Sequence, residues 1–411
     1  MKRTIALLLA LVMVFALCAC GNKEEAKPSD NAAGSEYRVA MITDYGDITD
    51  QSFNQTTYEA CKAFCEENSI DFTYYKPAGD NTPDRIAMVE KAVDEGYNVI
   101  VMPGFAFAGT ISGTQDQYPD VKFIALDVSE YDITSSFYKT DANGNVTDEL
   151  LDPNNEPHIA SNVYSAVYQE ELCGYMAGYA AVKLGYTKLG FLGGMAVPAV
   201  QRYGYGFVQG CDAAAAELNT TVDVKYAYGN QFFGDADITA AMDTWYAGGT
   251  EIVFACGGGI YTSAVDAAKK VEGAKVIGVD VDQAGVIANY AAGEGADAAT
   301  VEGYKALTVT SAMKGLYPAT FDTLTDVIVN GNWEKYSGKI DTLGLVSADD
   351  PAANYVQIPM ESTQWADGKF TQDDYKALVK AMFDGTVKVS SDISAMPATT
   401  AAHVEDLGNI K

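Results

Sequence analysis

The chain has 411 residues, of which 48% are hydrophobic, and its formal net charge is −29. This negative charge argues against nucleic acid or an anionic surface as a partner, because phosphate groups would be repelled. The hydrophobic content predicts a globular fold, and the length suits two lobes better than one core.

The chain begins with the pattern of a bacterial secretion signal. Lys2 and Arg3 precede thirteen apolar residues, Ile5 to Leu17, a run too short to span a bilayer. The following Leu17-Cys18-Ala19-Cys20-Gly21 resembles a lipobox, in which residues 1–19 are removed and Cys20 is lipidated. An ordinary signal with an incidental cysteine is the alternative.

Residues 20–36 are polar and predict a flexible tether behind the lipidated cysteine. We therefore expect an extracytoplasmic protein, anchored to the bacterial cell membrane by acyl chains on Cys20. The cysteines beyond the tether show no disulfide or zinc spacing, so no obligatory disulfide is expected. Cys61 and Cys65 fall on one face of an expected helix and are interpreted as small buried hydrophobic residues.

Short apolar strands alternate with amphipathic helices through the rest of the chain. This rhythm predicts βαβ units, and therefore an α/β fold of doubly wound parallel sheets. It breaks at the polar segment 131–157 and resumes with a long helix at about 168–183. One further helix is expected over 297–315 and another over 371–384. The expected strands are 38–42, 71–75, 98–102, 122–126, 188–192, 222–226, 251–255 and 275–279.

Aspartate and glycine follow the carboxyl ends of the expected strands. In doubly wound sheets these ends form the ligand crevice. Glycine lets backbone groups approach a ligand, and aspartate offers two acceptors for hydroxyl groups, so the pattern favours a polyhydroxylated, uncharged ligand. The residues are Asp44, Gly46, Gly104, Asp127, Gly193, Gly194, Gly257 to Gly259 and Asp280.

The turn after the first strand, Thr43 to Gln55, has the most specific pattern. Gly46 supplies a tight turn, and Asp50 is the expected N-cap of a helix, with its carboxylate accepting from first-turn N–H groups. Phe53 presents an aromatic face on the first helical turn, where open α/β sheets hold small ligands. Packing of Phe53 against the sheet is the alternative.

Several motifs resemble the basic membrane protein family, whose members are substrate-binding lipoproteins of ABC transporters similar to purine nucleoside receptor A. The resemblance implies a type I periplasmic-binding fold, in which two lobes close on a nucleoside, and an ABC permease as partner. The matching residues are Asp44-x-Gly46-x-x-x-Asp50-x-Ser52-Phe53-Asn54-Gln55, Gly190-Phe191-Leu192-Gly193-Gly194-Met195 with Pro198, Gly206-Phe207 with Gly210, Gly278-Val279-Asp280-Val281-Asp282-Gln283, Thr310-Ser311-Ala312-Met313-Lys314 and Gly385-Thr386-Val387-Lys388-Val389.

Within that fold we expect two lobes that the chain crosses several times. Residues 37–165 with about 284–325 are expected in the N-terminal lobe, and residues 166–283 with about 326–411 in the C-terminal lobe. No cofactor and no metal are expected.

In the family the base lies between two aromatic residues, one from each lobe. The resemblance places Phe53 as the first and Phe233 as the second, with Phe232 as the rival for the second position. Asn54 is expected at the edge of the purine, with first-turn capping as its alternative role. Asp44 either contacts the base or orders the turn.

The ribose is held in the family by acidic groups and a lysine. By resemblance, Asp127 and Asp280 accept from ribose hydroxyls, Lys314 donates to the ribose, and Gly258 offers backbone atoms. A solvated helix charge is the alternative for Lys314. The expected ligand is a purine nucleoside such as guanosine, inosine or adenosine.

The chain departs from the family pattern in two places, both expected to lie away from the ligand contacts. Segment 131–157 resembles an insertion, and Tyr203 stands where the family tends to carry Phe. The insertion has oxygens at calcium-loop spacing, but Val146 stands where such a loop needs Gly. A hairpin built on Asn143-Gly144 is the simpler interpretation.

Three alternatives to nucleoside capture remain. A receptor for a sugar or sugar-like signal would need only one-sided stacking. A nucleoside hydrolase would need a tighter carboxylate cluster than Asp44, Asp47 and Asp50 provide. A pure signalling receptor shares the fold. The two histidines, His158 and His403, lie beside no nucleophile motif, so we expect a binding protein and not an enzyme.

Overall fold

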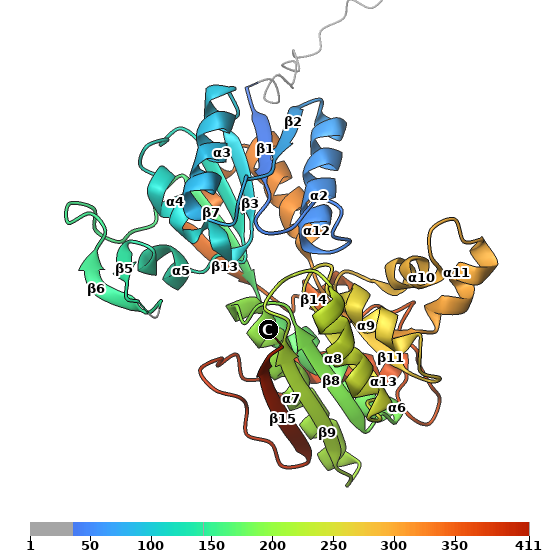
Figure 1. Ribbon diagram of the computed structural model, residues 1–411. Coiled ribbons are helices and arrows are strands. Elements are labelled where there is room, and N and C mark those ends of the chain that lie inside the picture. Colours follow the sequence, from blue (N-terminus) through green and yellow to red (C-terminus); the bar gives the residue numbers. More distant parts are fainter. Residues whose placement is uncertain (1–35, 143, 411) are drawn as a thin grey trace, which may run out of the picture. The chain divides into compact units, whose positions relative to one another are not determined.

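The computed structural model describes residues 36–142 and 144–410, which form two α/β lobes around separate sheets (Figure 1). The expected signal peptide 1–19, the lipobox with Cys20 and nearly all of the tether lie outside the described residues. No helix in the described ranges combines the length and the apolar character needed to cross a bilayer.

The first sheet has six parallel strands in the order β13-β7-β4-β3-β1-β2. Helices α3 and α4 lie together on one side of it, and α2 packs against α12 on the other (Figure 1). The strands are β1 (Arg38–Ile42), β2 (Asp71–Tyr75), β3 (Val99–Pro103), β4 (Lys122–Leu126), β7 (Val163–Tyr168) and β13 (Lys339–Leu343), and the helices are α2 (Phe53–Asn68), α3 (Thr82–Asp94), α4 (Ala108–Thr114) and α12 (Leu316–Leu324).

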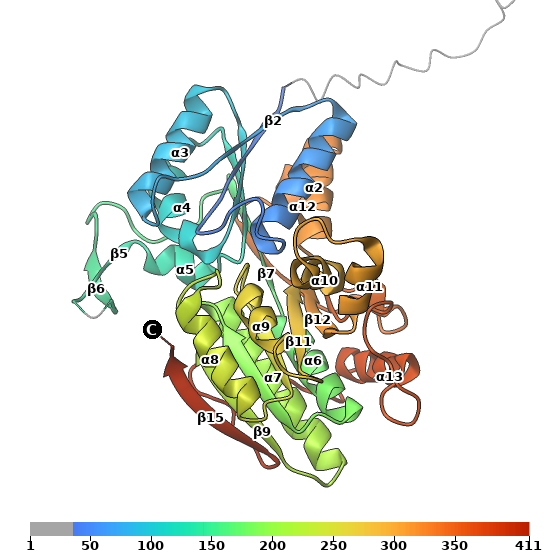
Figure 2. The same cartoon turned by 45° about the vertical axis from the view of Figure 1, so that its right-hand side comes forward.

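The second sheet has the order β14-β12-β11-β10-β8-β9-β15, with only the β12–β14 pair antiparallel in this sheet. Helices α8 and α9 lie side by side on one face, with α6 and α7 behind the sheet in Figure 2. The elements are β8 (Lys188–Gly193), β9 (Val222–Tyr228), β10 (Ile252–Cys256), β11 (Lys275–Asp280), β12 (Thr308–Lys314), β14 (Val356–Gln357), β15 (Ala402–Asn409), α6 (Glu170–Leu184), α7 (Pro198–Glu217), α8 (Ala236–Ala247), α9 (Tyr261–Ala268), α10 (Ala284–Ala292), α11 (Ala298–Lys305) and α13 (Gln372–Phe383).

The two parallel sheets confirm the predicted fold class, and the physical reason is the run of apolar residues in each central strand. Strand β3 is buried at every position, as is β10. Strands covered by helices on both faces read as continuous apolar segments, which is why the sequence locates them well. In each sheet the strand order reverses between two central strands, β1 and β3 in the first sheet and β8 and β10 in the second. Such sheets hold ligands at this switch point.

Helices α6 and α7 approach each other closely because glycine lines their contact. A Cβ atom at Gly206 would lie 2.1 Å from the carbonyl oxygen of Glu171, and one at Gly174 would lie 2.2 Å from that of Tyr203. Only glycine allows two backbones to come this near. The contact sets the N-terminal part of α6 against the second and third turns of α7.

The strand memberships differ from the expected lobe boundaries. The expectation that about 284–325 returns to the first lobe is wrong for β12, which pairs with β11 in the second sheet. The single helix expected over 297–315 is also wrong, because α11 ends at Lys305 and the β-branched run from Thr308 forms β12. Conversely, β13 pairs with β7 in the first sheet, although 326–411 was expected in the second lobe.

The chain therefore crosses between the sheets at three places. It passes from β7 to α6 at Gln169, from β12 to α12 at Gly315, and from β13 to β14 between Leu343 and Val356. Backbone hydrogen bonds tie these crossings together, from Gln169 N to Leu343 O at 3.0 Å and from Gly315 N to Tyr355 O at 2.7 Å. The three crossings therefore lie beside one another between the lobes.

The segment 131–157 forms a helix and a hairpin on the first lobe. Helix α5 (Glu130–Ser135) is followed by the antiparallel strands β5 (Tyr138–Thr140) and β6 (Val146–Leu150). The carboxylate of Asp141 accepts a hydrogen bond from the N–H of Asn145 at 2.9 Å. The paired strands confirm a hairpin in this segment, and Asn143 of the expected turn lies outside the described residues.

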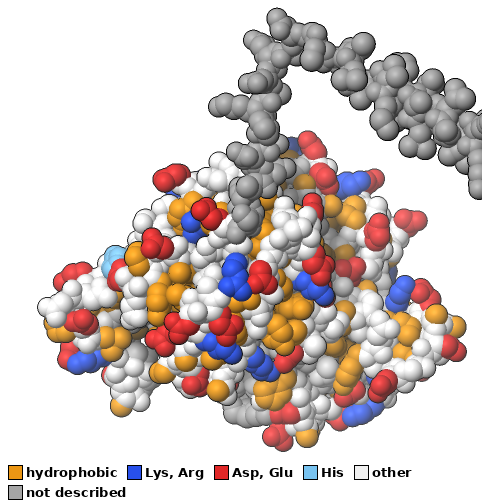
Figure 3. Space-filling view, turned by 90° about the horizontal axis from the view of Figure 1, so that it is seen from above, with side chains coloured by type: hydrophobic (Ala, Val, Ile, Leu, Met, Phe, Trp, Pro, Cys, Tyr) orange, Lys and Arg blue, Asp and Glu red, His pale blue; other side chains and the backbone are white. Residues whose placement is uncertain are grey.

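Many charged side chains lie on the surface, and Cys61 and Cys65 lie in the interior. Acidic side chains, with Lys and Arg among them, are spread over the face seen in Figure 3. Cys61 and Cys65 are buried on α2, as expected for small hydrophobic residues.

Candidate ligand-binding site

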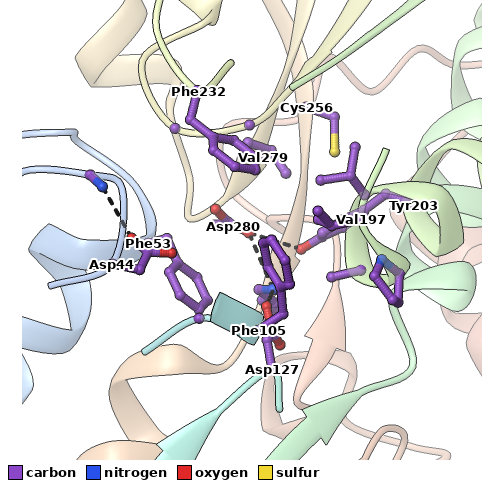
Figure 4. A pocket seen from close by; sticks show the side chains of 18 of the residues that line it. Asp44, Phe53, Phe105, Asp127, Val197, Tyr203, Phe232, Cys256, Val279 and Asp280 are labelled. Carbon is purple, nitrogen blue, oxygen red and sulfur yellow. Dashed lines mark hydrogen bonds and ion pairs between the residues drawn. The ribbon is translucent and has the colours of Figure 1, made fainter. Parts of the chain in front are cut away.

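A cavity of about 810 Å³, part of it open to solvent, lies at the carboxyl ends of both sheets. Its wall includes residues that follow β1, β3 and β4 of the first sheet and residues that follow or end β10, β11 and β12 of the second. Figure 4 shows the side chains that converge on it.

The turn after β1 is held by hydrogen bonds around Asp44 and Asp50. Asp44 Oδ1 accepts from the N–H of Gly46 at 3.1 Å and from Asn54 Nδ2 at 3.0 Å. Asp50 accepts from the N–H groups of Ser52 and Asn54 at 2.9 Å and of Gln55 at 3.0 Å. The turn therefore presents its side chains in a fixed geometry.

The N-cap prediction for Asp50 is wrong in position. Helix α2 begins at Phe53 with Ser52 as N-cap, and Ser52 makes no capping hydrogen bond with its side chain. Asp50, two residues earlier, satisfies the free N–H groups instead. Burial raises the pKa of Asp50 to about 6, and the hydrogen bonds from Gln55, Asn54 and Ser52 act in the opposite direction.

Aromatic side chains line the cavity from both lobes. Phe53, on α2, and Phe105, after β3, approach from the first lobe, and Phe232, after β9, approaches from the second (Figure 4). Phe233 was expected as the second aromatic residue at the ligand, but it is 61% exposed and does not line the cavity. Its neighbour Phe232 lines the cavity instead. One step along an irregular segment turns a side chain to the other side, which sequence does not specify.

Tyr45 connects these aromatic side chains. Its ring stacks on Phe105 with centroids 5.8 Å apart and lies 6.1 Å from Phe232, so aromatic contacts cross from one lobe to the other. On its other side the guanidinium of Arg85 lies 4.9 Å from the Tyr45 ring centroid.

A cluster of buried charges lies below the aromatic side chains. Lys314 Nζ forms an ion pair with Asp127 and lies 3.4 Å from Glu170 and 3.9 Å from Asp280. It also lies 4.7 Å from the ring centroid of Phe53. The alternative of a solvated helix charge is wrong for Lys314, which ends β12 and is 5% exposed.

The buried setting shifts the ionisation of this cluster. Burial disfavours the Lys314 ammonium, but Asp127, Glu170 and Asp280 outweigh that effect, and the pKa of Lys314 is raised. Burial also raises the pKa of Asp127, an effect that Lys314 opposes and Glu170 reinforces.

Asp280 is held from both lobes. Its Oδ2 accepts from Ser52 Oγ at 2.6 Å, and its Oδ1 accepts from the Tyr203 hydroxyl at 3.2 Å. Asp127 and Asp280 both have left-handed backbones, with φ of 60° and 64°. Such conformations are uncommon for residues other than glycine and concentrate at functional sites.

Two buried acceptors at the cavity have no hydrogen-bond partner in the described parts of the chain, Asn54 Oδ1 and Asp127 Oδ1. Both Asn54 donors are used by Asp44 and Asp50, so the amide offers only its oxygen. A buried acceptor without a donor is costly. Both residues line the cavity.

Seven of the eight expected ligand contacts line one cavity: Asp44, Phe53, Asn54, Asp127, Gly258, Asp280 and Lys314. Phe105, Arg202 and Tyr203 line it as well and were missed. Segment 131–157 and Tyr203 were expected away from the ligand site, but Asp132 and Tyr203 both line it. Arg202 and Tyr203 sit on a helix whose apolar pattern gives no sign of a charged contact.

No group of three His, Cys, Asp or Glu side chains within 36–142 and 144–410 is arranged to hold a metal ion. The cavity instead combines aromatic faces, carboxylates and one ammonium on a two-lobed α/β frame. This combination defines a solute-binding protein of the kind whose lobes close on a small ligand.

Comparison with known proteins agrees. The profile of the Bmp family, described as "ABC transporter substrate-binding protein PnrA-like", matches residues 37–349. The ABC transporter nucleoside-binding protein BmpA of Lactococcus lactis is 28% identical over 299 residues, 69% of this chain and 74% of that protein. Basic membrane protein A of Borreliella burgdorferi is 26% identical over 286 residues, 68% of this chain and 71% of that protein.

Solved structures show the same fold. A solute-binding protein of an ABC transporter system from Aeropyrum pernix superposes with a TM-score of 0.61 at 17% identity, covering 86% of this chain and 87% of that one. One from Conexibacter woesei gives a TM-score of 0.58 at 19% identity, covering 86% and 99%. The fold is the type I periplasmic-binding fold.

The chain belongs to the Bmp family of ABC transporter substrate-binding proteins. Proteins of this class act outside the cytoplasm and are not enzymes, as the sequence led us to expect.

Proposed function

We propose that this protein captures a purine nucleoside between its lobes and delivers it to the permease of an ABC importer. The observation that carries the proposal is the position of Phe53 and Phe232, which line one cavity from opposite lobes. Two aromatic faces can hold a flat base between them, and stacking of a base on an aromatic side chain contributes about 1–3 kcal/mol.

The charged cluster supports a ribose as the second part of the ligand. Asp127 Oδ1 is a buried acceptor that lacks a donor within the described residues, and Asp280 lines the cavity beside Lys314. Neighbouring sugar hydroxyls can donate to such carboxylates and accept from an ammonium.

The turn after β1 supports recognition of the base edge. Asn54 Oδ1 and the Asp44 carboxylate are acceptors at the cavity wall. Guanine, hypoxanthine and adenine each carry at least one N–H donor on the edge away from the sugar. The related BmpA of Lactococcus lactis is named a nucleoside-binding protein, in agreement with such a ligand.

A sugar or sugar-like signal is the second candidate, since it too would use Asp127, Asp280 and Lys314. It would leave the second aromatic face unused. Native mass spectrometry of the ligand-free protein in an equimolar mixture of inosine, guanosine, adenosine, ribose and glucose separates the two. A nucleoside complex is expected, with the nucleoside recovered intact; a sugar complex without any nucleoside complex would refute the proposal.

We further propose that Cys20 carries the lipid anchor after removal of residues 1–19. The Leu17-Cys18-Ala19-Cys20 pattern supports this. Expression in a bacterium with and without Cys20→Ser tests it: the unaltered chain should fractionate with membranes, and the variant should appear unlipidated by mass spectrometry.

A further inference from the structure

The cavity has two cationic side chains among its described lining residues, Lys314 and Arg202, and both pair with Glu170. Arg202 Nε donates to Glu170 Oε2 at 2.6 Å, and Lys314 Nζ lies 3.4 Å from Glu170 Oε1. Glu170 is fully buried and does not line the cavity. It therefore acts on a ligand only through the two cations.

The position of Glu170 is set by the frame of the protein. It is the first residue of α6, directly after the crossing at Gln169. The glycine contact between α6 and α7 fixes it relative to Arg202, since Gly206 lies against the carbonyl of Glu171 and Gly174 against that of Tyr203. Glu170 and Arg202 thus meet because the two glycines let the helices come this close.

The pairing sets the negative charge of Glu170 beside both cations and so weakens their attraction for an anionic ligand. Lys314 is also within ion-pair distance of Asp127 and Asp280. Burial and the Glu170 charge act in opposite directions on Arg202, and its pKa is raised on balance. A phosphate entering the cavity would compete with Glu170 for these cations, and drawing them away would leave the fully buried Glu170 short of partners.

We infer that Glu170 is a positioning residue that selects the class of ligand: by neutralising Arg202 and Lys314 it makes the cavity accept uncharged nucleosides and reject their phosphorylated forms. The inference rests on the proposed function for its nucleoside part. The competition between Glu170 and anions for Arg202 does not depend on which ligand is natural.

The test compares Glu170→Gln with Glu171→Gln in the mature protein. Glu171 is the next residue on the same helical turn and is also buried, but its Oε2 has no hydrogen-bond partner in the described ranges. Calorimetry gives the dissociation constants for inosine and inosine 5′-monophosphate. Thermal unfolding with increasing inorganic phosphate gives a second readout that needs no nucleoside.

Glu170→Gln should lower the ratio of the Kd for inosine 5′-monophosphate to the Kd for inosine by about tenfold or more. This factor corresponds to the strength of a charge-assisted hydrogen bond. It should also introduce a phosphate-dependent rise in Tm that is absent from the unaltered protein and from Glu171→Gln. The double variant Glu170→Gln/Arg202→Gln should lose both the altered ligand preference and the phosphate-dependent rise in Tm. The reason is that Arg202 is the cation that Glu170→Gln releases.

An unchanged preference together with an unchanged response to phosphate in folded Glu170→Gln would overturn the inference, as would equal effects in Glu171→Gln. If the unaltered protein binds no nucleoside, the proposed function fails, and the phosphate readout alone decides the role of Glu170. Circular dichroism establishes folding first. If Glu170→Gln does not fold, Glu170→Asp, which draws the carboxylate back by one carbon, must show the same two changes at smaller size.

Discussion

Lys314, the last residue of β12 in the second sheet, forms an ion pair with Asp127, which follows β4 in the first sheet. The pair joins the two lobes at the floor of the cavity, and Lys314 directly precedes the crossing at Gly315. The residues proposed to bind the ribose therefore also link the lobes, so ligand binding and lobe closure are expected to depend on each other.

The first prediction concerns the second aromatic side chain. Phe232→Ala should raise the Kd for inosine roughly 5- to 150-fold, the factor that corresponds to about 1–3 kcal/mol of base stacking. Phe233→Ala is the matched control, because it removes the same atoms from an exposed neighbour. Calorimetry at one temperature and salt concentration measures both.

The losses of affinity in Phe232→Ala and Phe233→Ala must differ if Phe232 is the second stacking residue. If Phe233→Ala weakens binding as much as Phe232→Ala, the second stacking face is wrongly assigned. Phe53→Ala, on the other lobe, should show a loss similar to that of Phe232→Ala.

The second prediction concerns the charge cluster. Lys314→Met removes the shared partner of three carboxylates, and breaking a buried ion pair in this way costs about 3–5 kcal/mol. The free energy of unfolding, measured in urea, should fall by that amount. Lys62→Met, which removes one partner of the exposed Lys62–Glu66 pair, should change it by less than about 0.5 kcal/mol. Equal effects of the two substitutions would show that the cluster does not stabilise the fold.

The third prediction concerns the turn that presents Phe53 and Asn54. Asp50→Ala leaves three backbone N–H groups without their acceptor and should lower the free energy of unfolding by about 1–3 kcal/mol. Asp47→Ala, in the same turn, removes an exposed ion pair with Lys76 and an exposed hydrogen bond from Thr49 Oγ1, and it should have little effect. A loss for Asp47→Ala as large as that for Asp50→Ala would contradict the role assigned to Asp50.

The fourth prediction concerns pH. Burial raises the pKa of Glu171 from 4.5 to about 7, so the folded protein holds this proton more tightly than the unfolded chain does. The contribution of Glu171 to stability is then greatest below about pH 4.5 and is lost as the pH rises to about 7, a change on the order of 3 kcal/mol.

Glu171→Gln removes this titration. The unfolding free energy of the variant should exceed that of the unaltered protein at pH 8, and the difference should shrink or reverse at pH 5. Urea denaturation at both pH values measures it. A difference that does not depend on pH would show that Glu171 titrates normally.

The sequence predicts the buried strands well because their apolar runs do not depend on distant contacts. The eight expected strands all occur, within one or two residues at each end. Strand β12 was mistaken for the end of a helix, since Thr308–Lys314 mixes small, polar and β-branched residues and pairs only through the fold. The lobe boundaries were wrong for the same reason: which sheet a late strand joins is decided by tertiary pairing.

Cavity residues that follow strand ends, such as Asp44, Asp127 and Asp280, could be predicted from the sequence. Residues whose side-chain direction depends on an irregular backbone, or that lie on helices, could not. Phe232 and Phe233 are adjacent and chemically identical, so only the backbone decides which one faces the cavity. Glu170 and Arg202 are charged residues on long helices, a pattern that normally indicates solvent exposure. Only the close packing of α6 and α7 shows that Glu170 is buried and paired with a partly buried Arg202.

The central claim is that the cavity binds a nucleoside as a base held between two aromatic faces and a sugar held by the charged cluster. Calorimetric titration of inosine, and separately of ribose, into the ligand-free protein tests it most directly. Inosine should bind with one site per chain and ribose far more weakly, because ribose lacks the stacked base. Tight binding of ribose with no heat from inosine, guanosine or adenosine would contradict the account.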